Sequence, residues 1–102
     1  MTIPFYANLL KQVVFSEGGP QPQSLFETDK FKVVVAGLEA GQKIPLHPEG
    51  AGVFYFLQGT GWMLVGEERF AIQSGATVIV PEGVARGMEA DSRLAFLATR
   101  IK

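Results

Sequence analysis

Glycine spacing constrains the fold of this chain more than any other feature of the sequence. From Phe31 onward, glycines at positions 37, 41, 59, 61, 66, 75 and 83 punctuate short runs of β-branched and aromatic residues. The runs are FKVVVAGL, VFYFLQ, WMLV, RFAI, ATVIV, VARGME and RLAFLATRI. None of them has the length or the period of an amphipathic helix. The pattern therefore predicts an all-β sandwich or barrel built from short strands.

Two turns can be placed within this pattern. Residues 66 to 69, GEER, lie between WMLV and RFAI and predict a tight hairpin, because Gly66 can take the positive φ that such turns require. Residues 91 to 93, DSR, predict a second turn. Pro81 has no amide hydrogen to give to a sheet, so we expect it to end the strand before it and direct Arg86 along the next.

The first part of the chain is less regular. Residues 16 to 24, SEGGPQPQS, contain two glycines and two prolines and predict an exposed connection. The preceding LLKQVVF fits a strand or a short helix, and we favour a strand that adds to a sheet edge, in its own domain or in a partner subunit. We therefore expect an N-terminal strand or arm with a linker over residues 1–23, and one β domain over residues 24–102.

Composition excludes several classes of function. The chain has 102 residues, of which 47% are apolar, and this is enough for one modest core. Its 9 basic and 10 acidic residues form no block of one sign, which argues against nucleic acid or a membrane as a partner. The absence of cysteine removes disulfides and thiolate chemistry. No signal-peptide pattern or membrane-length apolar run is present, so we expect a cytoplasmic protein.

Two glycine-framed segments carry a family resemblance. In the first, five residues separate Gly41 from His47; in the second, five residues separate Gly75 from Pro81, and Gly83 follows two positions later. On these residues the sequence resembles the two motifs of the cupin family, and with the strands between them the resemblance covers residues 30 to 100. It implies a double-stranded β-helix, a conical jelly-roll barrel that is often paired as a homodimer.

The positions that carry chemistry depart from the family pattern. In the cupins that this chain resembles, three histidines and one glutamate hold a divalent metal inside the barrel. Here only the first histidine is present, as His47, while Glu49 stands at the second and Arg86 at the third. The glutamate position falls at Gly52 when it is counted back from Gly59, with the spacing one residue short. The resemblance therefore implies a degenerate metal site.

The residue types at this site disfavour a metal. His47 and Glu49 leave the same face of a strand with backbones about 6.6 Å apart, but two ligands make a weak site. Arg86 is always charged and has no lone pair to donate. A guanidinium about 5 Å from an ion costs about 3 kcal/mol per unit of ion charge at an effective dielectric of about 20. We expect no cofactor, and we keep a divalent metal on His47 and Glu49 as the minor alternative.

The same three residues have both structural and functional interpretations. His47 is either a wall imidazole bonded to a neighbour, or a general acid, base or ligand donor. Glu49 and Arg86 either form a charge pair, or Arg86 binds a ligand anion while Glu49 orients His47. An unpaired Arg86 in an apolar interior would be too costly, so it needs a partner, whether Glu49, Glu89 or a ligand. We take His47, Glu49 and Arg86 as the candidate catalytic residues.

Aromatic and sulfur-containing side chains complete the candidate ligand site. Phe54 and Phe56 share one strand face and Tyr55 takes the other, and the sequence leaves open which face is inward. The candidate ligand-binding residues are His47, Arg86, Tyr55, Trp62 and Met88.

Three hypotheses of function follow from the sequence. The first is a protein that binds a small, anionic organic ligand in the barrel without the usual metal. The second is a metal-free isomerase, epimerase or cyclase in which His47 moves a proton and Arg86 stabilises negative charge. The third is a metal-dependent cupin enzyme such as a dioxygenase. Under each of them the expected partners are a small molecule and a second copy of the chain.

Overall fold

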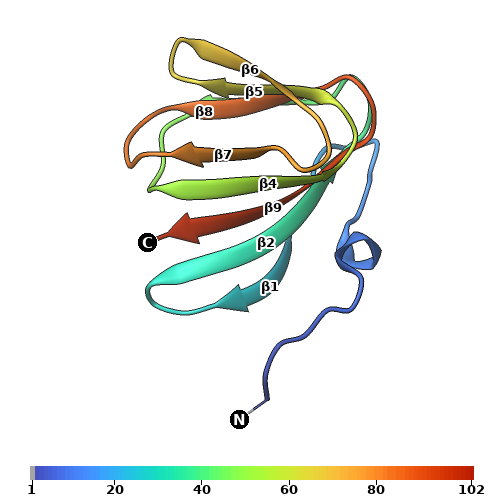
Figure 1. The fold of residues 1–102 in the computed structure, drawn as a ribbon, viewed down its shortest axis with the longest axis vertical. Helices are drawn as coiled ribbons and strands as arrows, with labels where there is room; N and C mark the ends of the chain where they lie inside the picture. Colours follow the sequence, from blue (N-terminus) through green and yellow to red (C-terminus); the bar gives the residue numbers. More distant parts are fainter. Residues whose placement is uncertain (1) are drawn as a thin grey trace.

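A computed structural model describes residues 2–102 and contains nine strands and one short 3-10 helix in that part of the chain (Figure 1). In chain order these are η1 (Leu9–Gln12), β1 (Gln23–Glu27), β2 (Phe31–Leu38), β3 (Lys43–His47), β4 (Gly52–Gln58), β5 (Gly61–Val65), β6 (Glu68–Ile72), β7 (Thr77–Val80), β8 (Arg86–Ala90) and β9 (Leu94–Ile101). Among residues 2–102, no helix is long and apolar enough to cross a membrane.

The strands form two antiparallel sheets. One has five strands in the order β1-β2-β9-β4-β7, and the other has four in the order β3-β8-β5-β6. The last strand, β9, lies inside the larger sheet between β2 and β4 (Figure 1). The all-β class and the jelly-roll fold are confirmed, but the two sheets are not closed into a barrel. Each sheet keeps two free edges, so the structure is a jelly-roll sandwich.

The strands β2 and β4 to β9 fall on the apolar runs of the sequence. The hairpin at residues 66 to 69 is confirmed, with Gly66 at φ 58°, and β7 ends directly before Pro81 as expected. Sequence patterns missed β1 and β3. Both are edge strands of five residues with an irregular register, and β3 contains Pro45, which an edge strand tolerates because one side of it needs no partner.

The N-terminal strand that we favoured is not formed. Residues Leu9–Gln12 make a 3-10 helix, whose first turn is capped where the Asn8 side chain accepts a hydrogen bond from the Leu10 amide at 3.2 Å. The chain then crosses the outer face of the larger sheet at Gly37, where an added β-carbon would lie 2.7 Å from the Phe15 ring and 2.8 Å from Val13. The segment covers a face of the sheet because glycine leaves room for it there.

The core lies between the two sheets. Along β4, Phe54 and Phe56 point inward and are 7% and 0% exposed, whereas Tyr55 between them is 43% exposed. This settles the inward face that the sequence left open. The buried apolar side chains that line this interior include Val34, Leu38, Met63, Val80, Met88, Leu94 and Phe96. The alternation along each strand decides which side chains of the candidate site face this interior.

Candidate functional site

A cavity of about 390 Å³ lies between the sheets and includes most of the candidate site. Its walls are largely apolar, and its polar groups are few. The apolar lining residues are Pro20, Pro22, Val34, Ala36, Ile44, Phe54, Met63, Gly87, Met88, Phe96 and Ala98. The polar lining residues are Lys32, His47, Glu49, Arg86 and Arg100. An apolar cavity with a small number of polar groups is the usual form of a small-molecule site.

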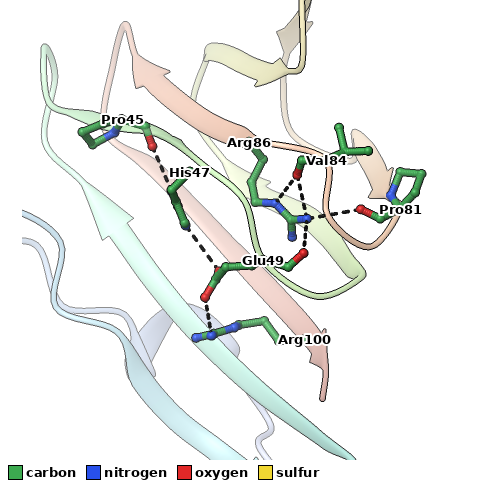
Figure 2. A network of polar contacts seen from close by, with 7 residues as sticks. All are labelled: Pro45, His47, Glu49, Pro81, Val84, Arg86 and Arg100. Carbon is green, nitrogen blue, oxygen red and sulfur yellow. Dashed lines mark hydrogen bonds and ion pairs between the residues drawn. The ribbon is translucent and has the colours of Figure 1, made fainter.

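His47 ends β3, and each of its ring nitrogens lies within hydrogen-bond distance of an oxygen acceptor (Figure 2). Its Nδ1 lies 2.9 Å from the Pro45 carbonyl oxygen, and its Nε2 lies 3.3 Å from Oε2 of Glu49. Both partners are acceptors, so a neutral imidazole can donate to only one of them at a time. The side chain is 44% exposed at the cavity mouth. Neither nitrogen can reach a ligand without giving up one of these contacts.

Glu49 follows β3 and uses its carboxylate and its carbonyl for different partners. The carboxylate lies between Nε2 of His47 and Nη2 of Arg100, and it forms an ion pair with Arg100. The carbonyl oxygen accepts from the Gly83 amide at 2.8 Å and from Nη2 of Arg86 at 3.2 Å. The carboxylate-guanidinium pair between Glu49 and Arg86 that the sequence allowed is therefore not present.

Arg86 begins β8 and is buried, with 2% of its surface exposed. Its guanidinium faces backbone carbonyls rather than a carboxylate (Figure 2). Nε donates to Val84 at 3.1 Å, and Nη2 contacts the carbonyls of Val84, Pro81 and Glu49 at 2.9, 3.3 and 3.2 Å. Nη1 is buried and has no hydrogen-bond partner among residues 2–102.

Two further cations, Lys32 and Arg100, line the cavity, and sequence reasoning missed both. They stand directly opposite each other on β2 and β9, where like charges ordinarily destabilise a strand pair. Arg100 is paired with Glu49, but Lys32 has no carboxylate within 4.0 Å and no side-chain hydrogen bond among residues 2–102. Lys32 shares strand parity with Val34 and Ala36, which would have placed it inward once the buried face of β2 was known.

The structure separates the other candidate ligand-binding residues. Met88 lines the cavity and is 2% exposed. Tyr55 lies on the outer face of the larger sheet, and Trp62 lies on the outer face of the smaller one, where the Arg69 guanidinium stacks over its ring at 3.9 Å. Tyr55 and Trp62 therefore lie outside the cavity, although their residue types are common in binding sites.

The side chains at this site do not match the needs of a bound metal. His47 and Glu49 offer two donor groups, and no cluster of three His, Cys, Asp or Glu side chains occurs within residues 2–102. The Glu49 carboxylate is already paired with Arg100, and the neighbouring Arg86 supplies only hydrogen-bond donors. A divalent ion here would have two guanidinium groups as neighbours. The donor set does not fit a metal centre.

No protein-family model and no curated protein matches the sequence. Solved structures do match it. An RmlC-like cupin protein from Desulfovibrio desulfuricans is 27% identical with a TM-score of 0.84, and the match covers 95% of each chain. The chain has the cupin fold. A Klebsiella pneumoniae protein with a double-stranded β-helix domain has the same TM-score at 22% identity, over 94% of this chain and 88% of that chain.

A conserved protein of unknown function from Streptococcus pyogenes also matches, with a TM-score of 0.87 at 19% identity over the whole of this chain and 90% of its own. At this level of identity the likeness concerns the fold. The fold brings the two motif segments together, because His47 on β3 and Arg86 on β8 are paired residues in the smaller sheet. These comparisons concern the fold, so the chemistry of His47 and Arg86 has to be argued from the contacts of the two residues.

Proposed function

We propose that this cupin binds a small organic anion in the cavity between its sheets, without a metal. The apolar walls suit the carbon skeleton of such a ligand, and the polar groups at the mouth suit its charged end. Three of the lining residues are cationic and one is anionic, so the cavity has a net positive charge before His47 is counted. An anion with an apolar body, such as a small aromatic or branched carboxylate, matches both the apolar walls and the positive charge of the cavity.

One observation carries this proposal: Lys32 lines the cavity with no ion-pair partner among the described residues. Arg100 is held by Glu49, and Arg86 is held by backbone carbonyls through Nε and Nη2, while its buried Nη1 is hemmed in beside position 52. Glu27 is the cross-strand neighbour of Lys32, but its carboxylate is hydrogen bonded to Lys102 at 2.6 Å, so Lys32 is the lining cation that a ligand can pair with at the least cost to an existing contact. Its partly buried position makes such a pair stronger than one on the open surface.

A metal-free acid-base enzyme at the same site is the second candidate. The contact between the Glu49 carboxylate and Nε2 of His47 favours it, because a carboxylate beside an imidazole orients the ring and supports proton transfer. However, the Pro45 carbonyl engages the other ring nitrogen, so His47 must release a partner before it can take a substrate proton. We therefore rank binding ahead of catalysis.

The binding proposal is tested by thermal shift and calorimetry with benzoate, 3-methylbutanoate and phenyl phosphate, each against a neutral amide or alcohol of similar shape. We expect at least one anion to stabilise the protein, by about 2.7 kcal/mol at 100 times its dissociation constant, and its neutral counterpart to have no effect. Lys32→Gln should weaken binding roughly tenfold, which corresponds to about 1.4 kcal/mol.

Lys30→Gln is the matched control, because Lys30 is exposed in the turn before β2 and does not line the cavity. Equal loss of affinity in both variants would show only a general charge effect. Equal binding of anions and their neutral counterparts would refute the proposal. Turnover of a bound anion, followed by NMR and abolished in His47→Ala, would favour the enzyme instead.

We further propose that the chain forms a homodimer. Ile3 and Phe5 in the N-terminal segment are 70% and 81% exposed, and Ile79 on the free edge strand β7 is 72% exposed. Large apolar side chains exposed to this degree favour contact with another chain. Light scattering after size-exclusion chromatography should give twice the chain mass, and Ile3→Ser with Phe5→Ser should lower it. A monomeric mass at all concentrations would contradict this proposal.

A further inference from the structure

The two loops at the mouth of the cavity are joined by the Arg86 side chain. One loop, residues 48–51, connects β3 to β4, and the other, residues 81–85, connects β7 to β8. The guanidinium contacts the carbonyl of Glu49 in the first loop and those of Pro81 and Val84 in the second. A backbone hydrogen bond from Gly83 to Glu49 adds to this link. One fixed positive charge thus gathers three oxygen atoms from both loops.

This arrangement resembles what a metal ion does in a protein, because in both cases oxygen lone pairs point toward a positive charge. A metal draws oxygen and nitrogen lone pairs around a charge that must be supplied from solution. The guanidinium draws carbonyl lone pairs through N–H donors and carries a charge that is part of the chain and persists at every physiological pH. Its planar fork suits carbonyls that lie in different directions.

Gly52 provides the space for this side chain. A β-carbon at position 52 would lie 3.2 Å from Nη1 of Arg86 and 3.0 Å from a ring atom of Phe54. Any side chain here would press on the guanidinium or on the ring. Position 52 is also where the family pattern aligned a metal-binding glutamate, and position 86 is where it aligned a histidine. Gly52 and Arg86, which both depart from the family pattern, are therefore neighbours in space, and the missing side chain of Gly52 leaves room for the guanidinium.

We propose that Arg86 is a built-in replacement for a metal ion in this cupin: its guanidinium crosslinks loops 48–51 and 81–85 with a permanent charge, and Gly52 leaves the room that it needs. Arg86 is a positioning residue in this proposal, since it acts through backbone carbonyls. The proposal concerns the organisation of the cavity mouth and does not depend on which ligand the cavity holds.

The decisive experiment restores the residues of the family pattern, a histidine at position 86 and a glutamate at position 52. We expect the double variant Arg86→His with Gly52→Glu, produced without a histidine tag, to bind Ni²⁺ or Zn²⁺ at one ion per chain, at least tenfold more tightly than the unmodified protein. Its melting temperature should rise on adding the metal and fall again with EDTA. Gly52→Glu alone should gain no metal site, because the carboxylate then faces a guanidinium. Adding His47→Ala to the double variant should remove the metal, because His47 supplies a ligand.

Two results would overturn the proposal directly. The first is a folded double variant, shown by circular dichroism, that gains no metal affinity. The second is near-stoichiometric transition metal in the unmodified protein that is lost in His47→Ala. If the double variant does not fold, the unmodified protein still tests the idea, since its melting temperature should be the same with EDTA, Ni²⁺ or Zn²⁺.

Hydrogen exchange tests the crosslink separately. In Arg86→Lys, which keeps the charge and loses the fork, the Gly83 amide should exchange at least tenfold faster, while amides in the β5–β6 hairpin keep their rates. Lys43→Arg is the control, because Lys43 is an exposed residue of the same sheet. Unchanged exchange at Gly83 in a folded Arg86→Lys variant would show that the guanidinium does not hold the loops together.

Discussion

At the scale of single residues, Glu49 has the most varied set of contacts in the cavity. Its carboxylate meets an imidazole and a guanidinium, and its carbonyl meets an amide and a second guanidinium. Because the carboxylate neutralises Arg100, it limits the positive charge that an anionic ligand would encounter. Glu49 therefore opposes the binding that Lys32 favours, and the two residues should respond to neutralisation with opposite signs.

Glu49→Gln should accordingly strengthen the binding of a small carboxylate by about twofold to fivefold, the range expected for a partly exposed charge. Glutamine keeps the size of the side chain and can still hydrogen bond to His47, so the change isolates the charge. Calorimetry at low and high salt measures the effect, which should shrink at high salt because the interaction is screened. Weaker binding in Glu49→Gln would mean that the carboxylate positions the ligand rather than repels it.

At the scale of elements, the pairing of β2 with β9 organises the larger sheet. Glu39 follows β2 and Arg93 precedes β9, and the Arg93 guanidinium donates to the Glu39 carboxylate at 2.7 and 3.1 Å. The Arg93 guanidinium also lies 4.7 Å from the centre of the Phe15 ring, so it contacts the N-terminal segment. One side chain therefore joins the end of the strand pair to the segment that covers the sheet.

The Arg93 hydrogen bond, and then its charge, lower the pKa of Glu39 below its ordinary value of 4.5. A carboxyl group whose pKa is lower in the folded state stabilises the fold above its unfolded pKa, and this contribution is lost as the pH falls through the folded pKa. Glu39→Gln should therefore lower the melting temperature slightly at pH 7, and the difference from the unmodified protein should begin to shrink as the pH falls below about 4.5 and disappear once the pH is below the folded pKa of Glu39. A difference that stays constant with pH would exclude the charge as its cause.

The contact of the N-terminal segment with Gly37 gives a second prediction at this scale. Gly37→Ala should force Phe15 and Val13 away from the sheet and destabilise the fold by about 1–3 kcal/mol, as overpacking does. Limited proteolysis should then cut residues 8–22 faster. Ala40→Gly in the exposed turn after β2 is a control that should leave the proteolysis pattern unchanged. An unchanged rate of cleavage in Gly37→Ala would show that this contact does not hold the segment.

At the scale of the whole molecule, both sheets are assembled from distant parts of the chain. β9, the last strand, lies between β2 and β4, and β8 lies between β3 and β5. The cavity walls exist only when these pairings are complete, because Phe96 and Ala98 of β9 face Met63 of β5 and Met88 of β8 across the interior. Binding and folding should therefore depend on the same strands.

Removal of residues 94–102 should abolish cooperative unfolding, because the larger sheet then loses its central strand and divides into two pairs. Removal of residues 2–5, which form no strand, should preserve a cooperative transition. Circular dichroism during thermal denaturation distinguishes the two. A cooperative transition in the chain that lacks β9 would contradict the assignment of this strand as the centre of the sheet.

The sequence by itself determined the fold class, the position of the strands from β4 to β9, the hairpin at Gly66 and the end of β7 before Pro81. These features follow from local chemistry: strand period, glycine conformation and the missing amide of proline. The resemblance of two segments to the cupin motifs also implied that His47, Glu49 and Arg86 lie at one site. Their roles stay predictions.

Only the tertiary structure decided which partners these residues take. It showed that the Arg86 guanidinium binds three backbone carbonyls and that the Glu49 carboxylate pairs with Arg100. It also placed Lys32 in the cavity, and Tyr55 and Trp62 outside it. Edge strands with irregular register, such as β1 and β3, carry little periodic signal. Hydrogen-bond partners and inward faces depend on which distant strands pair with each other. The alternation of side chains along a strand gives two sets of residues, but it cannot tell which set is buried until one buried residue is known.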